Sequence, residues 1–366
     1  MKNRLHIAWI VPGGIGTGAL QEGVPVLQQT VTALAQEHDV KVYSLFPVSS
    51  TYKPAGFGLW SAPYRRWTSV LRLLWQVRND HRSRPFDVVH GFWIRPGGLM
   101  AVVLQQWLHI PAVVTVQGGD AVYLPSIQYG QLSNSLFRQL AAWTLTKASA
   151  AVLLSGRQAE TLAGFGIHCA HPVQIEWGVG SQFTKHVRDF RSTLRCLIVG
   201  NQVAVKDQAT ALRTFSQLRG QVDARLTLVG EGPLRKALHS LVSELGIADH
   251  VTWIDSVSSH AIADLYHSHD ILLHTSLSEG QSLVVTEALH CGLLVAGTPV
   301  GPLVDIPESV VMADFGNPHA LSQRILETIN DTGKITSLYE QVAPWCEKTS
   351  LDVSLTRLIA LYNSLH

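Results

Sequence analysis

The sequence predicts an α/β protein with two doubly wound, Rossmann-like domains. The chain has 366 residues, and since a domain takes roughly 150 residues, this length favours two. Short runs rich in β-branched residues alternate with helical stretches in both halves, a pattern typical of parallel sheets with helices on both faces. Two such domains face each other across a cleft, and ligands of parallel sheets bind outside the carboxyl ends of the strands.

Five buried strands are expected in each half of the chain. In the first half they cover residues 5–11, 40–45, 87–90, 112–116 and 150–154. A glycine-rich loop and a helix ending near Gln36 follow the first of these strands. In the second half the strands are expected at residues 195–199, 225–229, 251–254, 271–274 and 293–296, each followed by a loop or a helix.

The boundary between the domains is expected in residues 181–192, a polar stretch that interrupts the alternation. Residues 1–185 are therefore assigned to the first domain and residues 191–345 to the second. Residues 351–366 have apolar side chains at helical spacing and no strand after them. We expect this last helix to pack back on the first domain.

Composition excludes several classes of protein. Apolar residues make up 46% of the chain and charged residues 15%, which excludes disorder of its bulk. The net charge of +1 argues against a nucleic-acid binder. Four cysteines without a C-x-x-C pair indicate neither a zinc knuckle nor a disulfide framework, and fit a reducing compartment.

Charge differs between the halves. Residues 1–190 hold 16 lysines and arginines against 9 acidic residues, a balance of +7, and residues 191–366 hold 12 against 18, a balance of −6. Either the two domains bind different partners or attract each other, or the difference is random variation in surface charge without a function.

Neither a signal peptide nor a membrane span is expected. Glycines follow the first apolar run at once, with no small-residue cleavage site. The most apolar long window, residues 98–116, is interrupted by polar residues and a proline, whereas a span needs about 20 nearly uninterrupted apolar residues. We therefore expect a cytoplasmic protein.

The loop after the first strand contains glycines at positions 13, 14, 16 and 18. Glycines let the backbone approach a ligand, and free N–H groups there can bind an anion. Their spacing is not that of a dinucleotide loop, and no acidic residue ends the second strand. A ligand-contacting loop and a tight turn without a ligand both remain open.

The strongest signal for chemistry lies in residues 270–302. Glu279 follows a buried strand, and Glu287 lies eight residues later in a helix expected to start near Gln281 or Ser282. The free N–H groups at residues 281–284 form a site suited to phosphate. A carboxylate beside them suits the vicinal hydroxyls of a sugar. Lys206 follows another strand and would complete a pyrophosphate site; the alternative is a solvated surface lysine.

These residues resemble the retaining glycosyltransferases of family 4, which have the two-domain GT-B fold. The pair Glu279 and Glu287 matches the family's E-x7-E motif, and the segment from Gly200 to Lys206 matches its glycine-lysine segment. Further matches follow the family's order at residues 13–14, 87–90, 115–120, 177–179, 229–233, 251–255, 265–266 and 287–292. The resemblance covers most of the chain.

The resemblance implies a hexosyltransferase that takes a hexose-type sugar from a nucleotide-diphosphate sugar, such as a UDP-sugar, in polysaccharide or glycolipid biosynthesis. Glu287 would bind the ribose and Glu279 the donor sugar. The diphosphate would be held by Lys206 and by the amides of Gln281, Ser282, Leu283 and Val284, near Gly200 and Asn201. The base would lie at Ile254 and Val257, with Gly14 and Gly16 closing on the phosphates. Gln117 is a catalytic candidate, and His90, Trp93 and Asp120 are candidates for the acceptor side.

The sequence departs from the family at three positions. Asn201 stands where the family commonly has arginine, which removes a positive charge beside the leaving group. Another cation compensates, or catalysis is weaker, or the donor differs. Gln117 replaces a histidine and can donate a hydrogen bond but cannot act as a general base. Gly180 replaces an aspartate.

A front-face displacement with retention of configuration is the expected mechanism, since no dedicated nucleophile is evident. No metal or other cofactor is expected, because Lys206 and the helix dipole would supply the positive field. Two alternatives remain: a nucleotide-sugar-binding pseudoenzyme that acts with a partner, and an isomerising enzyme on a similar scaffold.

The segment from Tyr64 to Arg84 has six arginines and one aspartate, with apolar residues at helical spacing. Such a helix can lie on an anionic membrane, which would make the protein peripheral to the inner face of a membrane with a lipid-linked or anionic acceptor. The alternative is a crossover helix packed on the first sheet with its arginines in water. Trp60, Trp67 and Trp75 near this side suit stacking on sugars or packing in the core.

Overall fold

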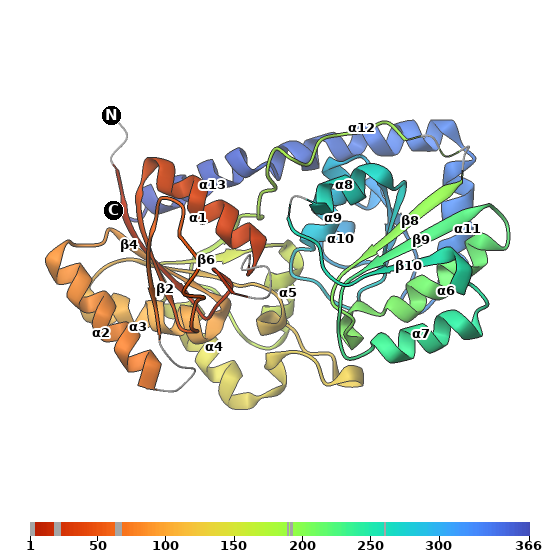
Figure 1. Ribbon diagram of the computed structural model, residues 1–366. Helices are drawn as coiled ribbons and strands as arrows, with labels where there is room; N and C mark the ends of the chain where they lie inside the picture. The colour runs from red at the N-terminus through yellow and green to blue at the C-terminus, as the bar shows by residue number, and fades with distance from the viewer. Residues whose placement is uncertain (1–3, 18–22, 63–67, 189, 191–192, 260) are drawn as a thin grey trace. The chain divides into compact units, whose positions relative to one another are not determined.

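The computed structural model describes residues 4–17, 23–62, 68–188, 190, 193–259 and 261–366. The chain forms two compact units, and each has its own parallel sheet (Figure 1). The first unit comprises Met1–Gly178 and Leu351–His366, and the second comprises Val179–Ser350. The first unit therefore ends at Gly178 rather than at the expected residue 185, and the segment 181–188 belongs to the second.

The first unit has a seven-stranded sheet in the order β3-β2-β1-β4-β5-β6-β7, with every neighbouring pair parallel. Its strands are β1 (His6–Val11), β2 (Asp39–Ser44), β3 (Gly58–Ser61), β4 (Val88–Phe92), β5 (Ala112–Thr115), β6 (Ala150–Leu153) and β7 (Pro172–Gln174). The five expected strands are confirmed to within two residues at each end. The edge strands β3 and β7 were not expected, because they are short, half-exposed and begin with glycine or proline.

The helices of the first unit are α1 (Pro25–Glu37), α2 (Thr68–Ser83), α3 (Leu99–Leu108), α4 (Ser135–Lys147), α5 (Gly156–Gly164) and α13 (Leu351–Asn363). One core lies between the sheet and α2, α3 and α4, and contains Leu73, Leu104 and Leu145. Helix α13 packs against α1. The predicted helix from Tyr64 to Arg84 is confirmed over Thr68–Ser83, and its first residues lie outside the described part of the chain.

The second unit has a six-stranded parallel sheet in the order β10-β9-β8-β11-β12-β13. Its strands are β8 (Leu194–Val199), β9 (Ala224–Val229), β10 (Val251–Ile254), β11 (Ile271–His274), β12 (Leu294–Gly297) and β13 (Val311–Met312). All five expected strands are confirmed, and β13 is an additional edge strand of two residues.

Helices cover both faces of the second sheet. They are α6 (Gln208–Arg219), α7 (Arg235–Glu244), α8 (Ala261–Ser268), α9 (Leu283–His290), α10 (Pro302–Asp305), α11 (Pro318–Ile329) and α12 (Thr332–Lys348). One core includes residues of α6, α7 and α11, and the other includes residues of α8, α9 and α12. Strands β8 and β11 are neighbours, so the loops after them start at the same edge of the sheet. Among the described residues, no helix is long and apolar enough to cross a bilayer.

Candidate active site

Lys206 and Glu279 meet at the carboxyl edge of the second sheet. Lys206 ends a short 3-10 turn after β8, and Glu279 lies in the loop after β11. Lys206 Nζ donates a hydrogen bond to Glu279 Oε1 over 2.6 Å, and the side chains are 23% and 13% exposed. The backbone of Leu277 donates to the carbonyl oxygen of Val205 over 2.7 Å, which ties the two loops together. The sequence prediction that both residues line one site is consistent with this geometry.

Two further side chains lie against the Glu279 carboxylate. Ser276 Oγ donates to Glu279 Oε1 over 2.7 Å, and His274 Nε2 lies 3.4 Å from the same oxygen. Burial raises the pKa of Glu279, but the Lys206 ammonium and His274 outweigh it and bring that pKa to about 2. Glu279 is therefore an anion at every physiological pH.

The first turn of α9 lies next to this pair. Ser282 is the N-cap residue but makes no side-chain cap, and its hydroxyl oxygen is buried with no hydrogen-bond partner among the described residues. A Cβ on Gly301 would come within 3.1 Å of Glu279 Cβ and 3.4 Å of the Ser282 backbone nitrogen. These contacts would be tight, and the φ of 53° at Gly301 also favours glycine there. The N–H groups of Leu283 and Val284 begin the helix, where a helix binds anions.

Glu287 lies on α9 and is bonded to Tyr266 of α8. Tyr266 Oη donates to Glu287 Oε2 over 2.8 Å, and Tyr266 is fully buried. Burial raises the pKa of Glu287 to about 7, although the tyrosine hydrogen bond acts in the opposite direction. The charges of the two glutamates therefore depend differently on pH: Glu279 is ionised throughout the physiological range, and Glu287 changes charge near neutral pH.

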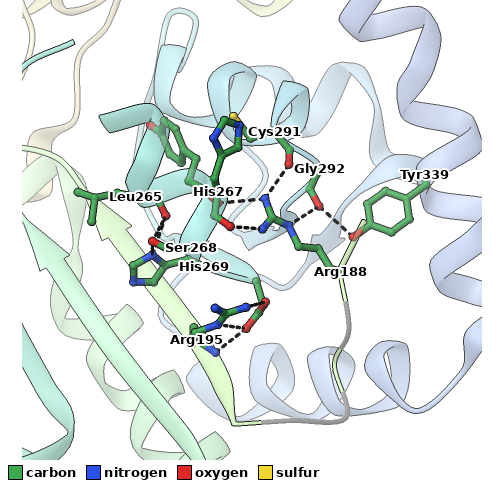
Figure 2. Close-up of polar contacts among 11 residues, drawn as sticks. Arg188, Arg195, Leu265, His267, Ser268, His269, Cys291, Gly292 and Tyr339 are labelled. Carbon is green, nitrogen blue, oxygen red and sulfur yellow. Dashed lines mark hydrogen bonds and ion pairs between the residues drawn. The ribbon is translucent and has the colours of Figure 1, made fainter. Parts of the chain in front are cut away.

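Arg188 fixes the ends of the helices that carry Tyr266 and Glu287 (Figure 2). Its guanidinium donates to the carbonyl oxygens of Tyr266 and His267 at the end of α8, over 3.0 and 2.6 Å. It also donates to the carbonyl oxygens of Cys291 and Gly292 after α9, over 2.7 and 3.3 Å. A cation suits the negative ends of both helix dipoles, so Arg188 sets the position of α8 relative to α9.

The other expected donor residues of the second unit lie at the same edge. Asn201 is exposed, and its carbonyl oxygen accepts from Gln208 Nε2 over 3.2 Å. A Cβ on Gly200 would lie 3.5 Å from Lys206 Cε, so Gly200 borders the lysine side chain. The carbonyl oxygen of Ile254 accepts from Gly230 N–H over 2.9 Å, while Val257 is half-buried against the α8–α9 core. Gln281 is half-buried in the loop before α9.

In the first unit, two neighbours hold Gln117 through its side-chain and carbonyl oxygens. Its side-chain oxygen accepts from Trp177 Nε1 over 3.2 Å, and its carbonyl oxygen accepts from Gln158 Nε2 over 2.6 Å. Its amide nitrogen Nε2 is buried without a hydrogen-bond acceptor among the described residues. Gln117 is therefore oriented as a donor.

Asp120 is a structural residue in this arrangement. It is fully buried and accepts hydrogen bonds from the backbone N–H groups of Ile94 over 2.8 Å, Gly118 over 2.9 Å and Gln117 over 3.2 Å. Burial raises its pKa, and these backbone bonds lower it only in part. The carboxylate orders the loop after β5 and has no exposed surface for an acceptor.

His90 is also inside the first unit. Its Nδ1 lies 2.6 Å from Tyr362 Oη and its Nε2 lies 2.6 Å from Thr115 Oγ1. Complete burial lowers its pKa to about 3, so the ring is neutral. Trp93 is half-buried with a φ of 60°, in the turn after β4. Of the three residues that the sequence suggested for the acceptor side, His90, Trp93 and Asp120, only Trp93 has a partly exposed side chain.

Gly14 and Gly16 are required by packing within their own loop. Both have positive φ, of 97° and 60°. A Cβ on Gly14 would lie 2.9 Å from Val24, and one on Gly16 would lie 2.6 Å from Val48 and Tyr52. Gly18, also noted in the sequence, lies outside the described residues. This local account is sufficient for both glycines, and a contact with phosphate remains a proposal.

Sequence reasoning did not assign His274, Ser276, Tyr266 or Arg188 to the site. His274 ends β11, and its place at the carboxyl end of a predicted parallel strand was a usable signal. Tyr266 belongs to the family match at residues 265–266 but was given no role, because it has the spacing of a core residue on α8. Arg188 acts through backbone carbonyl oxygens, and no sequence pattern marks it.

Both units match families of known proteins. Residues 23–176 match the glycosyl transferase 4-like domain, and residues 189–343 match glycosyl transferases group 1. An uncharacterized glycosyltransferase of Methanocaldococcus jannaschii is 23% identical over 79% of this chain and 78% of its own length. The N-acetyl-α-D-glucosaminyl L-malate synthase of Bacillus anthracis is 26% identical over 63% of this chain, and the match spans 60% of that relative's length.

Solved structures show the same fold. HepE of Anabaena in complex with UDP-glucose has a TM-score of 0.79 at 16% identity, with 99% of this chain and 100% of that chain covered. Sucrose-phosphate synthase of Thermosynechococcus elongatus has a TM-score of 0.79 at 18% identity, with 99% of each chain covered. These neighbours have the GT-B fold, as the sequence predicts. The chain belongs to the glycosyltransferases of the family 4 type.

Proposed function

We propose that this glycosyltransferase moves a hexose-type sugar from a nucleotide-diphosphate sugar to an acceptor hydroxyl, with retention of configuration and without a metal. The observation that carries the proposal is the Lys206–Glu279 pair beside the first turn of α9, with Glu287 farther along the same helix. One short segment thus offers a cation and free N–H groups for a diphosphate, and two carboxylates for sugar hydroxyls.

Each group has a defined part in this reaction. Lys206 and the N–H groups of Leu283 and Val284 bind the diphosphate, and Glu287 accepts hydrogen bonds from the ribose hydroxyls. Glu279 accepts from hydroxyls of the donor sugar. Positive charge from Lys206 and the helix dipole stabilises the leaving diphosphate, which is the part a metal ion plays in other transferases.

The transfer step needs no nucleophile from the protein. The bond between the anomeric carbon and the diphosphate oxygen breaks as the acceptor oxygen attacks from the same face of the sugar. The acceptor proton passes to the leaving diphosphate. Gln117 acts as a hydrogen-bond donor and not as a general base, because its amide group is not basic at neutral pH.

UDP-sugars are the first donors to test, since the structure of HepE, which shares this fold, was determined with UDP-glucose. We expect UDP to raise the melting temperature, with or without EDTA. A ligand at 100 times its Kd adds about 2.7 kcal/mol to the free energy of unfolding. Incubation with UDP-glucose, UDP-galactose and UDP-N-acetylglucosamine, followed by NMR of the product's anomeric proton, identifies the sugar and its configuration.

Three outcomes would contradict the proposal. An inverted product excludes retention, and loss of transfer with EDTA excludes metal independence. If no nucleoside diphosphate raises the melting temperature, the Lys206–Glu279 edge is not a donor site.

A further inference from the structure

Exposed large apolar side chains are concentrated on one part of the first unit. Seven such side chains occur among the described residues, and five of them lie on α2, α3 and α4. They are Leu71 (59% exposed), Trp75 (60%), Trp107 (48%), Leu136 (60%) and Trp143 (40%). Three of the five are tryptophans, one on each helix. Single apolar residues scattered over a surface are ordinary, but this grouping on three adjacent helices is not.

The three helices form one layer. Helix α3 packs against both α2 and α4, and all three bury their inner sides in the same core (Figure 1). Leu73 and Val77 of α2 point into that core, whereas Leu71 and Trp75 lie on the opposite side of the helix. The five exposed side chains therefore stand on the outer surface of this layer.

Positive charges share that surface. On α2, Leu71, Trp75, Arg78 and Arg82 follow at intervals of four, three and four residues, so they form one stripe along the helix. The Arg78 guanidinium lies 5.1 Å from the centre of the Trp107 ring, which joins α2 to α3 by a cation–π contact. We call Leu71, Trp75, Trp107, Leu136 and Trp143, with Arg72, Arg78, Arg82 and Lys147, the tryptophan face.

Acidic residues are almost absent from the same helices. The sequences of α2, α3 and α4 contain one acidic residue, Asp80, which forms an ion pair with Lys41 over 2.8 Å and accepts from Tyr43 Oη over 2.6 Å. Residues 1–178 and 351–366 together hold 15 lysines and arginines against 9 acidic residues, a balance of +6. The tryptophan face is thus both apolar and positive.

We propose that the tryptophan face docks on the surface of an anionic lipid bilayer. Tryptophan rings prefer the headgroup region, where one edge is apolar and the indole N–H stays hydrated. Arginines around them attract anionic headgroups. A second copy of this chain fits less well, because self-association through this face would bring like charges together.

Docking through this face is separate from the donor site. All its residues belong to the first unit, and binding to vesicles needs no nucleotide. The proposal goes beyond the transfer reaction, because it says where the enzyme works. Vesicle binding without donor binding, or the reverse, distinguishes failure of one proposal from failure of the other.

The test is co-sedimentation of the full chain with vesicles of phosphatidylcholine alone or mixed with phosphatidylglycerol. We expect binding to the mixed vesicles, little binding to phosphatidylcholine alone, and release by salt. The variant Arg72→Gln/Arg82→Gln is expected to bind the mixed vesicles about 25-fold more weakly, at about fivefold for each arginine near an anionic surface. The variant Trp75→Ala/Trp107→Ala/Trp143→Ala is expected to lose at least about tenfold.

Matched controls lie in the second unit. Phe315→Ala removes a side chain that is 45% exposed, and Arg213→Gln/Arg225→Gln removes two exposed arginines. Both controls should bind vesicles as the wild type does. Equal binding to both vesicle types, or equal losses in the controls, overturns the proposal. A concentration-dependent dimer that the tryptophan variant abolishes, in place of vesicle binding, also overturns it and assigns the face to self-association.

Discussion

Lys206 Nζ lies 2.6 Å from Glu279 Oε1, so the lysine sets the charge of the glutamate. The ammonium keeps the pKa of Glu279 at about 2 despite burial. A nucleotide diphosphate would compete with Glu279 for the same ammonium, while the donor sugar would give the carboxylate new partners. Binding of the donor therefore exchanges one ion pair for a set of contacts with the substrate, rather than adding contacts to an unpaired lysine.

Glu279→Gln is expected to separate binding from catalysis. The amide keeps the shape of the side chain but leaves Lys206 without its anion, so UDP should bind as tightly as before or more tightly. Transfer should fall by at least about 100-fold, because an oriented polar contact to the donor sugar is lost. Calorimetric titration with UDP and a transfer assay measure the two effects. Glu244→Gln, an exposed acid on α7, is the control; equal transfer by wild type and Glu279→Gln would remove Glu279 from the mechanism.

Lys206→Met should have the opposite effect on binding. Without the ammonium, the diphosphate would meet the Glu279 carboxylate with no cation between them, and UDP affinity should fall by roughly 10- to 100-fold. Uridine, which has no phosphate, should be affected much less. Lys236→Met, an exposed lysine of α7, should leave UDP affinity unchanged. A Lys206→Met variant with wild-type affinity for UDP would show that the lysine does not contact the diphosphate.

Glu287 should make nucleotide binding dependent on pH near neutrality. Burial raises its pKa to about 7, and the ionised carboxylate, which is only an acceptor, binds the ribose hydroxyls more strongly than the neutral acid does. Affinity for UDP should therefore rise about tenfold from about pH 6 to about pH 8, as the group loses its proton. Tyr266→Phe removes a hydrogen bond that lowers this pKa, so the midpoint should move to higher pH. Glu287→Gln should remove this pH dependence of UDP affinity. An unchanged pH profile in that variant would assign the pH dependence to another group.

The fold was predictable because its central strands are buried on both faces. Such strands are nearly continuous apolar runs, as at Ile271–His274, and the helices between them have their own periodicity. The edge strands Gly58–Ser61 and Pro172–Gln174 have half-exposed positions and no apolar run, so periodicity does not distinguish them from loops.

The candidate site was predictable where topology determines it. Lys206 and Glu279 are 73 residues apart in the sequence, but they follow two neighbouring parallel strands. Because the carboxyl ends of parallel strands lie at the same edge of a sheet, this topology alone brings the two residues together. In the first unit, Asp120 follows β5 and His90 lies within β4, and both are fully buried. Whether a polar residue near a strand end faces solvent depends on packing by distant segments, here Tyr362 of the last helix, and no local pattern shows this.

The last helix is joined to the rest of the first unit by an ion pair whose acidic partner is buried. The Glu176 side chain is fully buried, and its Oε2 accepts from Arg357 Nη1 of α13 over 2.7 Å. Arg357 also donates to the carbonyl oxygen of Gln174, so one guanidinium connects α13 to the segment at and after β7. Removing one partner leaves a buried charge without its counterion.

Arg357→Ala should therefore lower the free energy of unfolding of the first unit by about 3 kcal/mol. The double variant Arg357→Met/Glu176→Gln should recover part of this loss, because neither charge then remains to be buried. Urea denaturation followed by circular dichroism gives both values. Arg82→Gln, an exposed arginine of the same unit, should stay within about 0.5 kcal/mol of the wild type. If Arg357→Ala is as stable as Arg82→Gln, the pair contributes nothing to the attachment of α13.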